Sequence, residues 1–207
     1  MEIYNTEEQQ EEAIKRFLKE NGTSLVIGAF IGLAGIYGWN YYQKSQIDQM
    51  AQESLAYSQV TKTLASPEAS LDQASKFVAE HADTQYSQLT QLLMVKALVE
   101  KKEFDQATTI LKQVVASNVE QTVKSIAFMR LARIEMMQLR NDDALATLAK
   151  LNDSAFDVQK NELKGDIFLA QGDQVKARSA YQSAMDAAGD LPKGMLEMKL
   201  NDLTPAA

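Results

Sequence analysis

The stretch between Glu20 and Lys44 contains no charged residue, and it constrains this chain more than any other feature of the sequence. Its centre, Leu25–Tyr42, reads LVIGAFIGLAGIYGWNYY. A helix over residues 21–43 would be about 35 Å long at about 1.5 Å per residue, and the hydrocarbon core of a bilayer is about 30 Å thick. We therefore predict a single transmembrane helix over residues 21–43.

Three features favour a permanent anchor over a cleaved signal peptide. A polar segment precedes the apolar run, which is longer than the apolar region of an ordinary signal peptide, and no small-residue cleavage pattern follows it. Trp39, Tyr41 and Tyr42 gather at one end of the run, as amphipathic rings do at a membrane–water boundary. We expect this helix to remain in the mature protein.

The basic residues around the apolar run predict its direction through the membrane. Three of them precede it closely: Lys15, Arg16 and Lys19. On the other side Lys44 stands alone before Lys62. The positive-inside rule therefore predicts a cytoplasmic tail over residues 1–20 and an outside domain over residues 44–207. In a bacterial inner membrane, that domain would lie in the periplasm.

Three glycines lie on one face of the predicted membrane helix. Gly28, Gly32 and Gly35 are spaced at i, i+4 and i+7, which gives a smooth surface that another membrane helix can approach closely. Glycine is also common in membrane helices without such a contact. We predict this face as a helix–helix contact, with ordinary membrane-helix glycines as the alternative.

The outside domain shows the periodicity of helical hairpins. Apolar residues recur at a spacing of three to four, and short polar turns interrupt them. The best copy of a repeat has the order and spacing of a tetratricopeptide repeat (TPR). Its residues are Gly165, Asp166, Phe168, Gly172, Asp173, Ala177, Tyr181 and Ala184. Met195–Leu203 has helical spacing without a partner hairpin, and we predict it as the helix that caps the end of the stack.

Small anchor residues recur along this domain at nearly constant separations. They are Ala74, Ala107, Ala144 and Ala177, separated by 33, 37 and 33 residues. The expected TPR period is 34, and a small residue at this point lets the two helices of a hairpin cross closely. We therefore predict an all-α fold, with one transmembrane helix followed by a TPR-like α-solenoid and a capping helix. Other helical-hairpin solenoids share this logic and stay open.

The composition leaves little material for catalysis. The chain has no Cys and one His, which excludes thiolate metal sites and cysteine nucleophiles and leaves no His pair. We interpret His81 as a helix-terminal packing residue. The formal net charge is −7, from 21 Lys and Arg against 28 Asp and Glu, so a nucleic-acid partner is disfavoured. We expect a non-enzymatic protein without a cofactor.

A solenoid of hairpins offers a concave wall built from the first helix of each hairpin, where a partner commonly binds. The repeat register places nine residues on that wall: Leu92, Lys96, Val99, Met129, Arg133, Met136, Met137, Glu162 and Asp166. Met side chains adapt to varied apolar partners. Periodicity alone does not distinguish an open groove from core packing, so both interpretations of the methionines stay open.

With the anchor, its direction and the repeats in place, the chain resembles the YfgM family, the ancillary subunits of the bacterial SecYEG translocon. The resemblance rests on motifs in the same order along the chain: Met1–Tyr4, Lys15–Phe17, Glu20–Gly22, Gly38–Trp39, Leu55–Tyr57, Leu131–Arg133 and Ala177–Tyr181. It covers essentially the whole chain.

The resemblance implies a single-span protein of the inner membrane that associates with SecYEG and with the membrane-anchored periplasmic chaperone PpiD. It further implies a role in passing translocated polypeptides to periplasmic chaperones, and a second role for the cytoplasmic tail in restraining an envelope-stress response. Two other classes stay open. A membrane-anchored TPR scaffold for envelope assembly or division would have the same layout, whereas the lack of a nucleophile motif argues against an envelope hydrolase.

Overall fold

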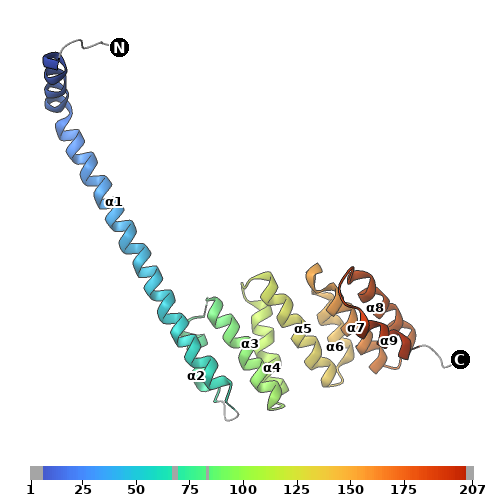
Figure 1. The fold of residues 1–207 in the computed structure, drawn as a ribbon. Coiled ribbons are helices and arrows are strands. Elements are labelled where there is room, and N and C mark those ends of the chain that lie inside the picture. The colour runs from blue at the N-terminus through green and yellow to red at the C-terminus, as the bar shows by residue number, and fades with distance from the viewer. Residues whose placement is uncertain (1–6, 67–69, 83, 204–207) are drawn as a thin grey trace. The chain divides into compact units, whose positions relative to one another are not determined.

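The computed structural model describes residues 7–66, 70–82 and 84–203, and its regular elements are helices without any strand in these ranges (Figure 1). This confirms the predicted all-α fold. The chain divides into two compact units, Met1–Leu55 and Ala56–Ala207. The first six residues, which carry the Met1–Tyr4 motif and the start of the predicted tail, lie outside the described residues.

Helix α1, Glu7–Leu64, contains the whole predicted membrane span. The helix continues past both ends of that span, so the predicted boundaries at residues 21 and 43 are not helix ends. Its apolar stretch has a mean hydropathy of 1.4, and none of it is buried among the described residues. Large side chains such as Phe30 and Tyr37 are 74% and 78% exposed. An uncovered apolar surface of this length is stable in a lipid bilayer and costly in water.

Within the described residues, the second unit is a stack of four helical hairpins. The first hairpin pairs the end of α1 with α2 (Asp72–Glu80). The next three pair α3 (Gln85–Glu100) with α4 (Phe104–Ala116), α5 (Gln121–Met137) with α6 (Asn141–Ala149), and α7 (Asp157–Ala170) with α8 (Gln174–Ala187). A short 3-10 helix, η1 (Ser154–Phe156), precedes α7.

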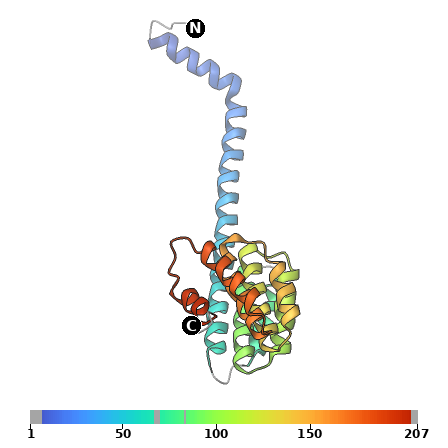
Figure 2. The same cartoon turned by 90° about the vertical axis from the view of Figure 1, so that its right-hand side faces the viewer.

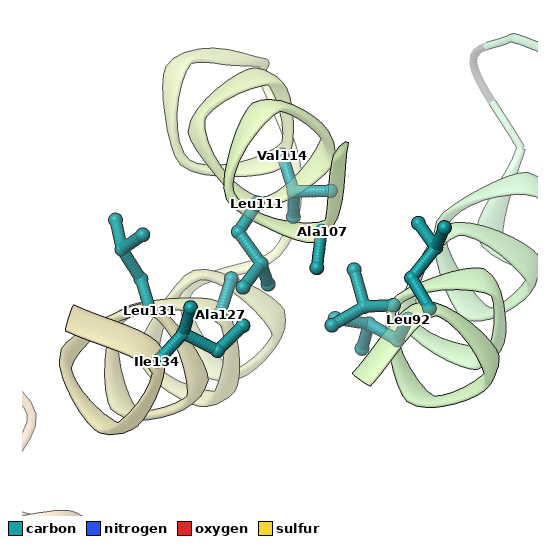
Figure 3. Packing of buried hydrophobic residues seen from close by; sticks show 9 residues of the cluster. Leu92, Ala107, Leu111, Val114, Ala127, Leu131 and Ile134 are labelled. Carbon is teal, nitrogen blue, oxygen red and sulfur yellow. The ribbon is translucent and has the colours of Figure 1, made fainter. Parts of the chain in front are cut away.

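The predicted anchor alanines lie where the two helices of each hairpin meet. Ala74 is 1% exposed, and Ala107, Ala144 and Ala177 are fully buried. Larger side chains fill the space between neighbouring hairpins. Figure 3 shows Leu111 of α4 and Ile134 of α5 directed into the space that α3, α4 and α5 enclose. The register predicted from the alanine spacing is therefore confirmed.

The stack ends with α9, Gly194–Asp202, as the sequence predicted for a capping helix. Figure 2 shows the loop after α8 extending outward before the chain returns as α9. Leu196 and Leu203 are buried against Tyr181 and its alanine neighbours on α8. The ring of Tyr181 in turn lies on Gly165 of α7, where an added Cβ would collide with it. The last hairpin and the cap therefore form one packed layer.

The turns between the paired helices carry the same backbone feature in three hairpins. Lys102, Leu139 and Gly172 have φ values of 62°, 62° and 80°. In each turn the next amide N–H donates to the carbonyl five residues back, for example Arg140 N to Glu135 O at 2.8 Å. This is the Schellman helix end, which favours glycine because a Cβ is strained in the left-handed region. Leu139 bears that strain while its side chain is 83% exposed.

We expect Leu139→Gly to stabilise the protein by about 1 kcal/mol, since glycine removes the left-handed strain and the exposed leucine loses no packing. Thermal unfolding of the full chain in detergent, followed by circular dichroism, should show a rise in Tm of about 2–4 °C. Gly172→Ala at the equivalent turn should lower the Tm. An unchanged or lower Tm for Leu139→Gly would contradict the assigned turn geometry.

Candidate partner-binding surface

One position of the repeat lies on the same side of each first helix. Lys96 on α3, Arg133 on α5 and Asp166 on α7 each precede the anchor alanine of their hairpin by 11 residues. Lys96 and Arg133 are exposed and Asp166 is half-buried. These three side chains therefore mark one wall of the solenoid, and they differ in charge along it.

A groove of about 330 Å³ lies on this wall between α3 and α5, and we call it the α3–α5 groove. Its lining residues are Val95, Lys96, Val99, Glu100, Arg130, Arg133, Ile134 and Met137. Val95 and Ile134 form a buried apolar floor. Met137 is 55% exposed at the edge, so the groove is open to solvent and apolar at its base.

The rim of the α3–α5 groove carries more positive than negative charge. Nη1 of Arg130 donates a hydrogen bond of 2.7 Å to the carbonyl oxygen of Leu92, which ties the guanidinium to α3. Burial, and then repulsion by Arg133, lower the pKa of Arg130. Lys96 lies 3.7 Å from Glu100 in an exposed pair within one helix, a kind of pair that contributes little. Arg133 makes no hydrogen bond or ion pair within the described ranges.

The groove brings together four of the nine residues predicted for the wall, namely Lys96, Val99, Arg133 and Met137. Leu92 and Met129 do not lie on the open wall, since each is only 5% exposed, and for Met129 this favours the core interpretation that the sequence left open. Leu92 packs in the core of α3, α4 and α5, and Met129 packs between α5 and the helices that follow it. Both side chains lie on the face of the first helix that packs against the neighbouring hairpin, so the stacked hairpin covers them. Met136 is half-buried against the same cluster as Met129.

The other two predicted wall residues, Glu162 and Asp166, bind the capping helix. Nζ of Lys199 on α9 lies 2.7 Å from Oε1 of Glu162 and 2.7 Å from Oδ1 of Asp166. The hydroxyl of Tyr181 donates to the same Asp166 oxygen at 2.7 Å. This part of the wall is therefore already occupied by a segment of the chain itself.

The charges in this cluster shift the pKa values of its donors. Burial lowers the pKa of Lys199, but its hydrogen bonds to Asp166 and Glu162 outweigh that effect, so the net pKa is raised. Burial and the hydrogen bond to Asp166 also raise the pKa of Tyr181. The raised pKa values extend to higher pH the range in which the lysine is charged and the phenol is protonated, the states in which α9 is attached by charge and by hydrogen bonds.

Sequence reasoning did not identify four of the groove residues: Val95, Glu100, Arg130 and Ile134. Each lies one helical turn from a residue that was predicted. Val95 lies four positions before Val99, and Glu100 lies four positions after Lys96. Arg130 and Ile134 each lie three positions before a predicted residue of α5, a spacing that shares one helical face. Extending the predicted wall by one helical turn in each direction would have found all four.

The glycine face predicted on α1 is open in the structure. A Cβ added to Gly28, Gly32 or Gly35 would have no atom within 4 Å outside its own helix backbone. The backbone is therefore bare along this face, as a close helix–helix contact requires. The contact itself stays a prediction.

The single histidine of the sequence lies away from the α3–α5 groove. His81 follows the last residue of α2, and its ring centroid is 4.6 Å from that of Phe77. This is the packing role that the sequence predicted. Across the described ranges, no group of three or more His, Cys, Asp or Glu side chains is arranged to hold a metal ion.

Comparison with known proteins supports the same architecture. The sequence model of the tetratricopeptide repeat-like domain family matches residues 15–205. The ancillary SecYEG translocon subunit of Escherichia coli K12 is 34% identical over 207 residues, covering 99% of this chain and 100% of the relative. The chain belongs to the family of ancillary SecYEG translocon subunits.

Two further relatives carry the same name. The protein from Aggregatibacter actinomycetemcomitans is 35% identical over 202 residues, and that from Haemophilus influenzae Rd is 32% identical over 202 residues. Each alignment covers 97% of this chain and 99% of the relative. No solved structure shows significant similarity to the chain. The family resemblance that the sequence motifs indicated is confirmed.

We expect Met129→Glu and Met137→Glu to differ sharply, although both place a carboxylate on α5. Truncation of a buried methionine alone costs about 2–5 kcal/mol, and a buried carboxylate adds the cost of its desolvation. Met129→Glu should therefore unfold or aggregate the domain, whereas the exposed Met137→Glu should change stability by less than about 0.5 kcal/mol. Thermal unfolding of each full-length variant in detergent measures the difference. Equal Tm values would contradict the assignment of core and groove.

Proposed function

We propose that this chain is a non-enzymatic accessory subunit of the SecYEG translocon in the bacterial inner membrane. In this proposal α1 anchors the chain, and the TPR-like unit binds partner polypeptides on the periplasmic side. The α3–α5 groove is the observation that carries the binding role, since it is open, apolar at its base and charged at its rim. The names of the family members support the translocon as the site of action.

The orientation rests on the basic residues that flank the apolar part of α1. Lys15, Arg16 and Lys19 precede it, and Lys44 alone follows it closely. The positive-inside rule then keeps the amino terminus in the cytoplasm. The TPR-like unit would consequently stand in the periplasm, on the side where translocated polypeptides emerge.

The groove suits the transient binding of polypeptide. Val99 and Met137 offer apolar contact over the buried base of the groove, and the flexible Met137 can adapt to different shapes. A small and open site of this kind gives weak binding, which suits a protein that passes its cargo on. The recipients in this proposal are periplasmic chaperones, with the membrane-anchored PpiD as the partner that stays beside the translocon.

The cytoplasmic tail offers a second surface. Ile14, Phe17 and Leu18 lie on one face of α1 before the membrane span, and their side chains are exposed. An exposed apolar face on a helix can bind a partner protein or the membrane surface. In this proposal the face binds the partner through which the tail restrains an envelope-stress response.

Association with the translocon would use the glycine face of α1. Gly28, Gly32 and Gly35 leave its backbone bare, and membrane helices approach one another most closely at small residues. The TPR-like unit would then remain available for periplasmic partners. In this proposal the glycine face of α1 contacts the translocon, and the α3–α5 groove contacts periplasmic partners.

We expect Gly32→Leu to reduce co-purification of SecYEG from mildly solubilised membranes, because the bulk of the leucine side chain separates the two helices. Membrane insertion should be preserved, because leucine is more hydrophobic than glycine. Ala34→Leu is the matched control. Residue 34 lies about 200° around the helix axis from Gly32, so the added leucine is on the face opposite the glycines. Recovery of SecYEG and PpiD at equal expression is the measurement. Recovery that is the same for wild type and Gly32→Leu would contradict the role of the glycine face. Recovery of division or envelope-synthesis proteins in place of SecYEG would favour the scaffold alternative.

A further inference from the structure

We propose that the α3–α5 groove selects acidic segments of polypeptide in which a carboxylate lies beside a large apolar side chain. This inference rests on the proposed function and names the chemistry of the polypeptide bound there. It follows from the floor of the groove, from the charges on its rim and from the way the same wall binds α9.

The apolar lining of the groove accounts for the large apolar side chain in the bound segment. Its accessible apolar surface comes from Val99, which is half-buried, and Met137, which is 55% exposed. Val95 and Ile134 are buried beneath them and close the base of the groove. The volume of about 330 Å³ is at the small end of ligand sites, which suits a side chain more than a folded domain.

The rim accounts for the carboxylate. Three cationic side chains line the groove, Lys96, Arg130 and Arg133, and Glu100 is the one carboxylate among its lining residues. Arg130 is held in place by its 2.7 Å bond to the Leu92 carbonyl oxygen. Arg133 repels Arg130 and has no partner of its own among the described residues. A carboxylate bound between the two guanidiniums would relieve that repulsion and accept charge-assisted hydrogen bonds.

The binding of α9 shows how this wall holds a segment. Lys199 inserts its charge between Glu162 and Asp166, while Leu196 and Leu203 of the same segment are buried next to it. Apolar contact and one opposite charge together hold this helix at α7. In the α3–α5 groove the position of Asp166 is taken by Arg133, so the charge of the wall is reversed. A segment suited to this groove carries a carboxylate where α9 carries Lys199.

The positive rim of the α3–α5 groove contrasts with the net negative charge of the whole chain. With a formal net charge of −7, the protein carries an excess of carboxylates, which disfavour acidic polypeptides wherever they line the surface. Acidic segments would therefore bind only where the local charge is positive and an apolar contact adds to it. Both conditions are met together at the α3–α5 groove.

The test measures binding of short fluorescein-labelled peptides to the full chain in detergent by fluorescence anisotropy. One peptide repeats Leu–Asp pairs between Gly–Ser spacers, a second replaces Asp with Lys, and a third replaces Leu with Ala. The variant is Arg133→Glu. Lys112→Glu, at an exposed position of α4 that does not line the groove, is the control with the same change of charge.

We expect the Leu–Asp peptide to bind the wild-type chain more tightly than either of the other two. Arg133→Glu should weaken that binding by about tenfold or more, the equivalent of one lost charge-assisted contact. It should also strengthen binding of the Leu–Lys peptide, a gain that damage to the fold cannot produce. Lys112→Glu should change neither affinity by more than about twofold, since exposed charges at a distance are screened.

Two results would overturn the inference. One is equal binding of the Leu–Asp and Leu–Lys peptides to the wild-type chain. The other is an Arg133→Glu variant that binds the Leu–Asp peptide as tightly as the wild type does. Either result would leave the association with SecYEG untouched, because the Gly32→Leu co-purification tests that association separately.

Discussion

The close crossing of two helices at a small side chain is the constraint on which the rest of the TPR-like unit depends. Ala107, Ala144 and Ala177 are fully buried at these crossings. Each crossing fixes which face of the first helix turns toward the next hairpin and which face stays in solvent. Lys96, Arg133 and Asp166 come to lie on one wall because each stands at the same distance from its alanine.

The elements of the fold could be predicted because local patterns determine them. A charge-free run of this length specifies a membrane helix, and alanines at a nearly constant period specify stacked hairpins. The candidate site was predicted only in part. Periodicity shows that Leu92 and Met129 lie on an apolar face, but only the stacking of hairpins shows that this face is covered. The contact of Lys199 with Glu162 joins residues 37 apart, and no local pattern predicts it.

The charges along the wall explain why its two ends differ. At α7 the carboxylates of Glu162 and Asp166 bind Lys199 of the chain's own last helix. At the α3–α5 groove no described segment of the chain binds the arginines in this way, and the apolar floor stays open. A single repeat architecture thus provides an occupied site that completes the fold and an open groove, which we propose as the site of a partner.

Photo-crosslinking from the α3–α5 groove in intact cells measures whether this groove contacts translocated polypeptide. A photoreactive phenylalanine analogue at Met137 should form an adduct with a precursor arrested in the translocon, whereas the same analogue at Lys112 should not. That result requires the groove to be open and to lie on the periplasmic side. No adduct from Met137, or equal adducts from both positions, would contradict the account.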